Sequence, residues 1–170
     1  MKGSQRARNI TVTDKLTLGV NAVVRIKKSG NEGYDTLLPK SANQGVLTTT
    51  KSVAANESGT HFVLNTATAF VTTLPAPAAG LEYWFHIGAT VPTTTHTVVT
   101  NASANIIVGN ICTPEDAAGS VPVVQDADTI SFVANLAVHG DFAHVWTDGT
   151  NWYLDGMCSV EDGMTTTQVS

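Results

Sequence analysis

The sequence has few cysteines and few charged residues, and its larger part has no basic residue. Two cysteines occur among 170 residues, 14% of the residues are charged, and residues 52–170 contain neither lysine nor arginine. No apolar run reaches the roughly 18 residues that a membrane-spanning helix needs. The basic N-terminus is not followed by the apolar stretch of a secretory signal. We therefore expect no membrane partner, and a protein kept in a cytoplasm or assembled there.

Motifs typical of enzymes and of metal sites are also missing. The sequence contains no GxSxG, P-loop, GxGxxG or CxxC motif. Its aspartates occupy turn-like positions, where they bond their own backbone, and are not arranged as a glycosidase pair. The five histidines lack the spacing of a zinc site, and they are His61, His86, His96, His139 and His144. We expect no enzymatic activity, no cofactor and no metal site. The sequence leaves open two alternatives for the histidines: two or three of them converge in space, or one of them, repeated around a three-fold axis, binds a metal ion.

Short apolar–polar alternations separated by turn formers dominate the chain after residue 53. In LEYWFHI (residues 81–87), Tyr83 and Phe85 alternate with Trp84 and His86, which is the period of a β-strand. Strands are expected at residues 61–65, 69–74, 81–87, 95–100, 104–109, 120–125, 129–134, 142–147 and 151–156, with one or two more within 16–26. The sequence predicts an all-β protein with a β-sandwich or jelly-roll-like domain.

Residues 142–156 predict a hairpin whose turn is DGTN, with Gly149 supplying a positive φ. Phe142 and Trp146 lie on one side of it, and Trp152 on the other. We expect these three aromatic residues to belong to the core. The alternative is a sugar-stacking platform formed by an exposed Trp146 or Trp152.

Charge is divided sharply along the chain. All nine basic residues lie in residues 1–51 with three acids, so this segment carries +6, and the eleven acids of residues 52–170 give that part −11. Such asymmetry indicates an interaction arm attached to an oppositely charged body. Because an acidic body repels phosphate, we expect the arm to bind protein and not nucleic acid.

Three regions are predicted from this pattern. Residues 1–51 form a basic N-terminal arm, partly extended with short strands; residues 52–156 form the β-sandwich body; and residues 157–170 form a polar C-terminal tail. Cys112 and Cys158 are expected to be free and buried thiols, although the sequence does not exclude that they pair.

Part of the body resembles a known family. The segment AANESGTHFVLNTATAFVTTLPAPAAGLEYWFHIGA, followed by ANIIVGNI, DTISFVA and GDFAHVWTDGTNWYLDG, is similar to small β-rich virion proteins of tailed bacteriophages. These are often capsid decoration, or cement, proteins, and similar hairpins occur in tail fibres and spikes. The resemblance covers about residues 53–156. It implies a homotrimer on the outer surface of the virion capsid, with an N-terminal arm that contacts the major capsid protein and no catalytic residues.

Under this interpretation the basic arm carries the partner-binding residues. We expect charge-assisted contacts to capsid carboxylates, or to a neighbouring trimer, from Lys2, Arg6, Arg8, Lys27 and Lys28. A solvated basic tail is the alternative for these five. The alternative for the whole protein is a receptor- or glycan-binding module of a tail fibre or spike, which would expose aromatic residues beside polar ones.

Overall fold

The computed structural model describes residues 24–27, 34–37, 44–114 and 123–168. The chain divides into two units, Met1–Ser41 and Ala42–Ser170. In the first, β1 (Val24–Lys27) pairs with β2 (Tyr34–Leu37) in an antiparallel hairpin. No described helix has the length and apolar character needed to cross a membrane.

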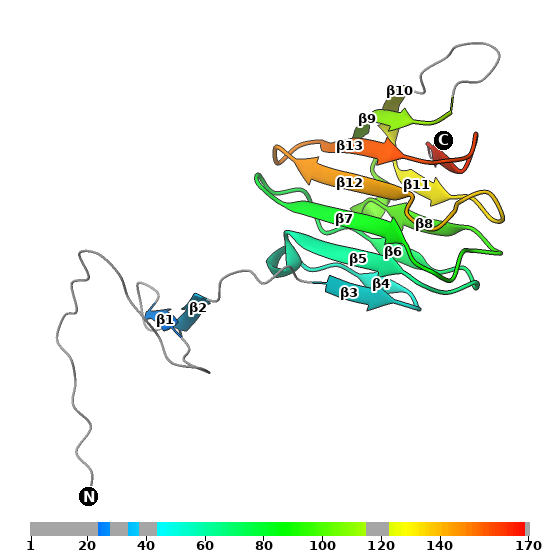
Figure 1. Cartoon of the computed structure of the whole chain (residues 1–170). Coiled ribbons are helices and arrows are strands. Elements are labelled where there is room, and N and C mark those ends of the chain that lie inside the picture. Colours follow the sequence, from blue (N-terminus) through cyan, green and yellow to red (C-terminus); the bar gives the residue numbers. More distant parts are fainter. Residues whose placement is uncertain (1–23, 28–33, 38–43, 115–122, 169–170) are drawn as a thin grey trace, which may run out of the picture. The chain divides into compact units, whose positions relative to one another are not determined.

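The second unit is a sandwich of two sheets (Figure 1). The seven-stranded sheet has the spatial order β10 (Val123–Ala127), β9 (Ile107–Cys112), β13 (Trp152–Met157), β12 (Phe142–Thr147), β7 (Glu82–Ile87), β5 (Thr60–Leu64) and β3 (Gln44–Leu47). The five-stranded sheet has the order β14 (Met164–Thr167), β11 (Thr129–Phe132), β8 (His96–Val99), β6 (Val71–Thr73) and β4 (Lys51–Ser52). Two short 3₁₀ helices, η1 (Ala55–Glu57) and η2 (Asn101–Ser103), connect strands. The predicted all-β sandwich is confirmed.

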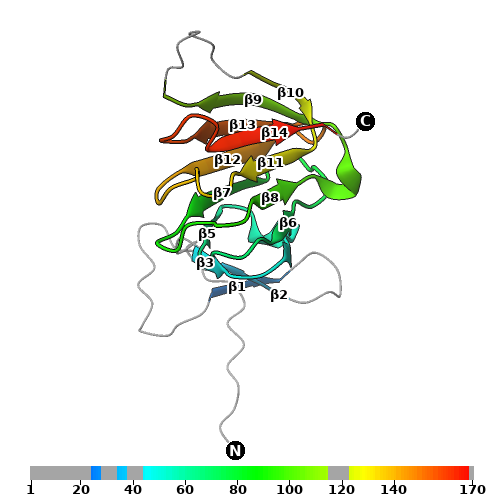
Figure 2. The same cartoon turned by 90° about the vertical axis from the view of Figure 1, so that its right-hand side faces the viewer.

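Successive strands from β3 to β8 alternate between the two sheets (Figure 2). A strand that crosses to the other sheet and returns runs in its original direction, so β3, β5 and β7 pair in parallel, as do β4, β6 and β8. A jelly roll is built from antiparallel pairs. The strands from β3 to β8 therefore wind back and forth between the two sheets. The parallel pairs that result distinguish the topology of this sandwich from that of a jelly roll.

The core lies between the two sheets and follows the period of two in the strands. On β7 the burial alternates residue by residue, so that Tyr83 and Phe85 are fully buried while Trp84 is half-buried. Ile130 and Phe132 of the five-stranded sheet face the same interior. Burying each large apolar side chain stabilises the fold by about 1.5–3 kcal/mol.

The predicted boundaries of the body are wrong at both ends. Residues 44–47 form β3 and residues 51–52 form β4, so the predicted arm contributes the whole of β3 to one sheet and the first residue of β4 to the other. At the other end, β14 pairs with β11 along its whole length, although it falls within the predicted tail. The sandwich therefore extends from residue 44 to residue 167. Two- to four-residue strands of this kind are held by their partners and leave little pattern in the sequence.

Candidate binding face of the seven-stranded sheet

The outer surface of the seven-stranded sheet carries most of its rings. These side chains alternate with core residues on four adjacent strands and point away from the core. We call this surface the aromatic–histidine face; it consists of His61, Trp84, His86, Phe142, His144, Trp146 and Tyr153. A solvated sheet face is usually polar, so a continuous surface of rings indicates a binding surface.

Strand register places these rings against one another. Trp84 lies directly opposite His144, and their rings stack with centroids 3.9 Å apart and an interplanar angle of 11°. Trp146 lies opposite Tyr153, with centroids 4.3 Å apart. Aromatic cross-strand pairs stabilise a sheet by about 0.2–1 kcal/mol each. The face is therefore held rigidly by its own stacking.

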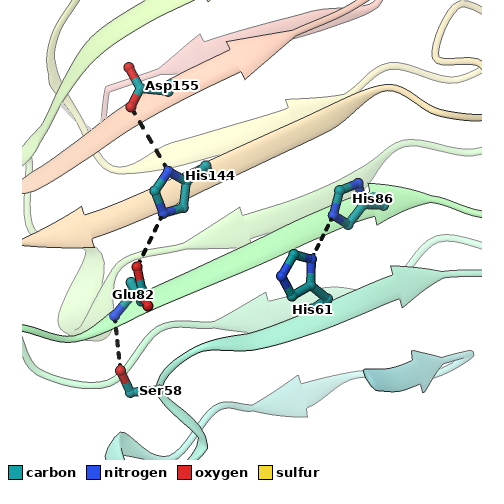
Figure 3. Close-up of polar contacts among 6 residues, drawn as sticks. All are labelled: Ser58, His61, Glu82, His86, His144 and Asp155. Carbon is teal, nitrogen blue, oxygen red and sulfur yellow. Dashed lines mark hydrogen bonds and ion pairs between the residues drawn. The ribbon is translucent and has the colours of Figure 1, made fainter. Parts of the chain in front are cut away.

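His144 lies between two carboxylates from neighbouring strands (Figure 3). Its Nε2 is 3.7 Å from Oε2 of Glu82, and its Nδ1 is 3.9 Å from Oδ2 of Asp155. These distances are too long for hydrogen bonds, and Nε2 is buried without a partner. The carboxylates flank opposite nitrogens of one ring, so they do not converge with His144 on a single point.

A second histidine pair lies beside Trp84 on the same face. Nδ1 of His61 on β5 is 3.2 Å from Nε2 of His86 on β7 (Figure 3). Burial lowers the pKa of His86 below its ordinary value, and the nearby charge of His61 lowers this pKa further. His86 is therefore neutral at neutral pH, and one N–H···N hydrogen bond joins the two rings.

Exposed apolar side chains extend the face beyond its rings. Val46 on β3 is 64% exposed and Met157 on β13 is 45% exposed, and among the rings themselves Trp146 is 40% exposed. Within residues 44–168 the one basic side chain is that of Lys51 on β4 of the other sheet, and it pairs with Glu57 at 2.9 Å. The face is thus apolar and aromatic, and its charged side chains, such as Glu82 and Asp155, are acidic.

The prediction that all three hairpin aromatics belong to the core holds for one of them. Trp152 is fully buried and its ring lies 5.9 Å from that of Tyr83. Phe142 and Trp146 project from the opposite side of the hairpin, where the outer face lies. The predicted two-sidedness of residues 81–87 and 142–156 is confirmed. Tyr153, which stacks on Trp146, was missed, although the same alternation places it on that side.

The predicted partner-binding residues lie beyond what the structure describes. Lys2, Arg6, Arg8 and Lys28 are outside the described residues. Lys27 is the last residue of β1, but its side chain is not described. Their role in binding carboxylates of the capsid or of a neighbouring trimer stays a prediction.

The cysteines are free, as predicted, but only Cys158 is buried. Cys112 ends β9 on the outer face and is exposed, although its carbonyl oxygen accepts a hydrogen bond from the Cys158 amide at 2.9 Å. Within the described residues no group of three or more histidine, cysteine, aspartate or glutamate side chains is arranged to hold a metal ion.

Comparisons with known proteins give no match. No family model, no curated protein and no solved structure is detectably similar to this chain.

Proposed function

We propose that this protein is a structural virion component that binds the outer surface of a phage capsid as a homotrimer and bridges capsid subunits. The observation that carries the proposal is the segregation of charge, with +6 in residues 1–51 and −11 in residues 52–170. A cationic segment joined to an anionic sandwich suits binding to acidic protein surfaces. The arm and the body then have separate partners.

The aromatic–histidine face supports a protein-binding role for the body. Its rings are packed rigidly, Trp146 among them is exposed, and exposed Val46 and Met157 extend the face with apolar surface. Interface cores are enriched in aromatic residues and depleted of lysine, which matches this face. In the proposed trimer it serves as contact surface between copies or with the shell.

The proposed trimer stabilises the capsid shell because it binds assembled and dissociated capsid subunits differently. A trimer that binds the assembled lattice, and not dissociated subunits, stabilises the lattice by mass action. Three arms on one trimer bind as a unit, so modest contacts from each arm add up to strong collective attachment.

Deleting residues 1–12 is expected to leave the sandwich folded and to weaken capsid binding. The deletion removes Lys2, Arg6 and Arg8, and exposed ion pairs contribute about 0.2–1 kcal/mol each, so we expect about tenfold weaker attachment per arm. The measurement is the number of copies bound per shell, and the temperature at which the shell opens, when purified chain is added to capsids lacking it.

Two controls accompany the deletion. A triple Lys2→Gln, Arg6→Gln, Arg8→Gln variant of full length should reproduce it, whereas Lys51→Gln should not, because Lys51 pairs with Glu57 within the body. Full capsid occupancy by the deleted chain would remove the arm from the mechanism. Mass spectrometry of virions tests the role itself, since hundreds of copies per particle indicate a shell component and a handful indicate a tail part.

A glycan-binding module of a tail fibre or spike is the second candidate, favoured by one observation. Trp146 is exposed and stacked on Tyr153, whose hydroxyl donates to Asp148 at 3.0 Å. An exposed ring beside polar acceptors is suited to stacking on a sugar. If this function is correct, a glycan array probed with the full chain will give a defined hit that Trp146→Ala abolishes, while buried Trp152 takes no part. An array without hits contradicts it.

A further inference from the structure

The two nitrogens of the His61–His86 pair are spaced like two ligands of one metal ion. They lie 3.2 Å apart. Zinc and similar ions bind imidazole nitrogen at about 2.0–2.1 Å, so this separation corresponds to an angle of about 100° at the ion, between octahedral and tetrahedral values. The rings are nearly parallel, with an interplanar angle of 8° and centroids 5.4 Å apart, and metal binding requires both rings to rotate until their facing lone pairs share one point.

Neighbouring rings hold the pair in place. The Trp84 ring lies parallel to both, with centroids 5.3 Å from His61 and 5.9 Å from His86. The Phe142 ring also packs against His86, with the two ring centroids 5.8 Å apart. Register fixes the backbones as well, because His61 pairs with Trp84 and Val63 pairs with His86. Ligands ordered before binding lose less entropy when the ion arrives.

We propose that His61 and His86 form a surface site for one divalent transition-metal ion of the class that prefers imidazole, namely Ni²⁺, Cu²⁺ or Zn²⁺. Nδ1 of His61 and Nε2 of His86 are the protein ligands, and water completes the coordination. Both protein ligands are imidazole nitrogens, and the site needs no carboxylate or thiolate. It therefore favours ions that prefer imidazole over Mg²⁺ or Ca²⁺, which prefer oxygen ligands. With two ligands the site is open, so further donors, including those of a bound partner, have room to coordinate.

Binding replaces the hydrogen bond between the two rings. In the metal-free pair one of the facing nitrogens carries the proton and the other accepts it. When the ion binds, His61 carries its proton on Nε2 and His86 carries its proton on Nδ1, so both facing lone pairs are donated to the ion.

Titration of the full chain with NiCl₂ at neutral pH tests the site. We expect calorimetry to give saturable binding of one Ni²⁺ per chain, with paramagnetic broadening of amide resonances centred on β5 and β7. His61→Gln and His86→Gln should each weaken binding about tenfold or more, since even outer-shell changes at metal sites cost 10–100-fold. Both substitutions lie on the outer face, and thermal unfolding verifies that each variant folds.

Three matched variants locate the ion. His139→Gln removes an exposed histidine elsewhere, His144→Gln removes the third histidine of the face, and Cys112→Ser removes the exposed thiol. All three should bind Ni²⁺ as the unchanged chain does. Absence of saturable binding, unchanged binding in both His61→Gln and His86→Gln, or binding lost with His139, His144 or Cys112 would overturn the proposal.

Discussion

Replacing Gly109 with alanine is expected to destabilise the protein by about 4 kcal/mol, which is enough to unfold much of a domain of ordinary stability. Gly109 has φ +149°, a conformation that side chains rarely adopt. A Cβ there would lie 2.0 Å from the Leu154 carbonyl oxygen and 2.8 Å from its carbonyl carbon. Both strain and overlap therefore oppose the substitution.

The overlap cannot be relieved locally. Gly109 on β9 pairs with Leu154 on β13 on one side and with Val124 on β10 on the other. The atoms that the new methyl group meets are backbone, not the end of a flexible side chain. Separating the strands breaks the parallel β9–β13 pairing, which joins the outer two strands to the rest of the seven-stranded sheet.

Gly80→Ala is the matched control. Gly80 has φ +85°, but no atom lies within 4 Å of the position of its added Cβ. Gly80→Ala should therefore lower the free energy of unfolding only by the cost of the positive φ, about 1 kcal/mol. Urea unfolding, monitored by circular dichroism, measures the free energy of unfolding of both variants. Equal losses in the two variants would show that the contact with Leu154 is relieved without cost.

The period of two in the sequence predicts the longer strands of the sandwich, but it predicts neither the short strands β3, β4 and β14 nor the side of β12 that faces the core. On β12 the inward residues are small, Ala143 and Val145, while the large rings of Phe142 and Trp146 point outward. Side-chain size alone favours burial of the large rings and exposure of the small residues, so the sequence predicts these two rings in the core. Register with Tyr83 and Phe85 of β7 decides the side, and register is a tertiary property.

The His61–His86 pair illustrates a second limit of sequence. The two residues are separated by 25 positions and match no metal-site spacing. Their proximity depends on the parallel pairing of β5 with β7, which itself depends on a crossover through β6 in the other sheet. Local patterns carry no information on such a crossover, so the absence of a spacing motif did not exclude a pair of ligands.

Replacing Asp141 with alanine is the second change expected to have a large effect, about 3–4 kcal/mol. The carboxylate is fully buried. Its Oδ2 accepts the Val138 amide at 2.8 Å, and its Oδ1 accepts the amide and the hydroxyl of Ser159, each at 2.9 Å. It thereby ties the turn before β12 to the segment after β13. Alanine leaves three donors without this acceptor, and partly buried donors are poorly served by water.

Asp148 provides a matched control, because its carboxylate also accepts three hydrogen bonds but lies in the exposed hairpin turn. Its donors are the amides of Thr150 and Asn151 and the hydroxyl of Tyr153. These hydrogen bonds hold the pKa of Asp148 below its usual value, with the largest effect from the Asn151 amide, then the Thr150 amide, then the Tyr153 hydroxyl. Because the turn is exposed, water can replace the carboxylate as the acceptor for each donor. Asp148→Ala should therefore lose far less stability than Asp141→Ala, with Asp141→Asn between them, since the amide keeps one acceptor oxygen. Thermal and urea unfolding of the three variants measure the order, and a loss at Asp148 equal to that at Asp141 would show that burial does not set the strength of these contacts.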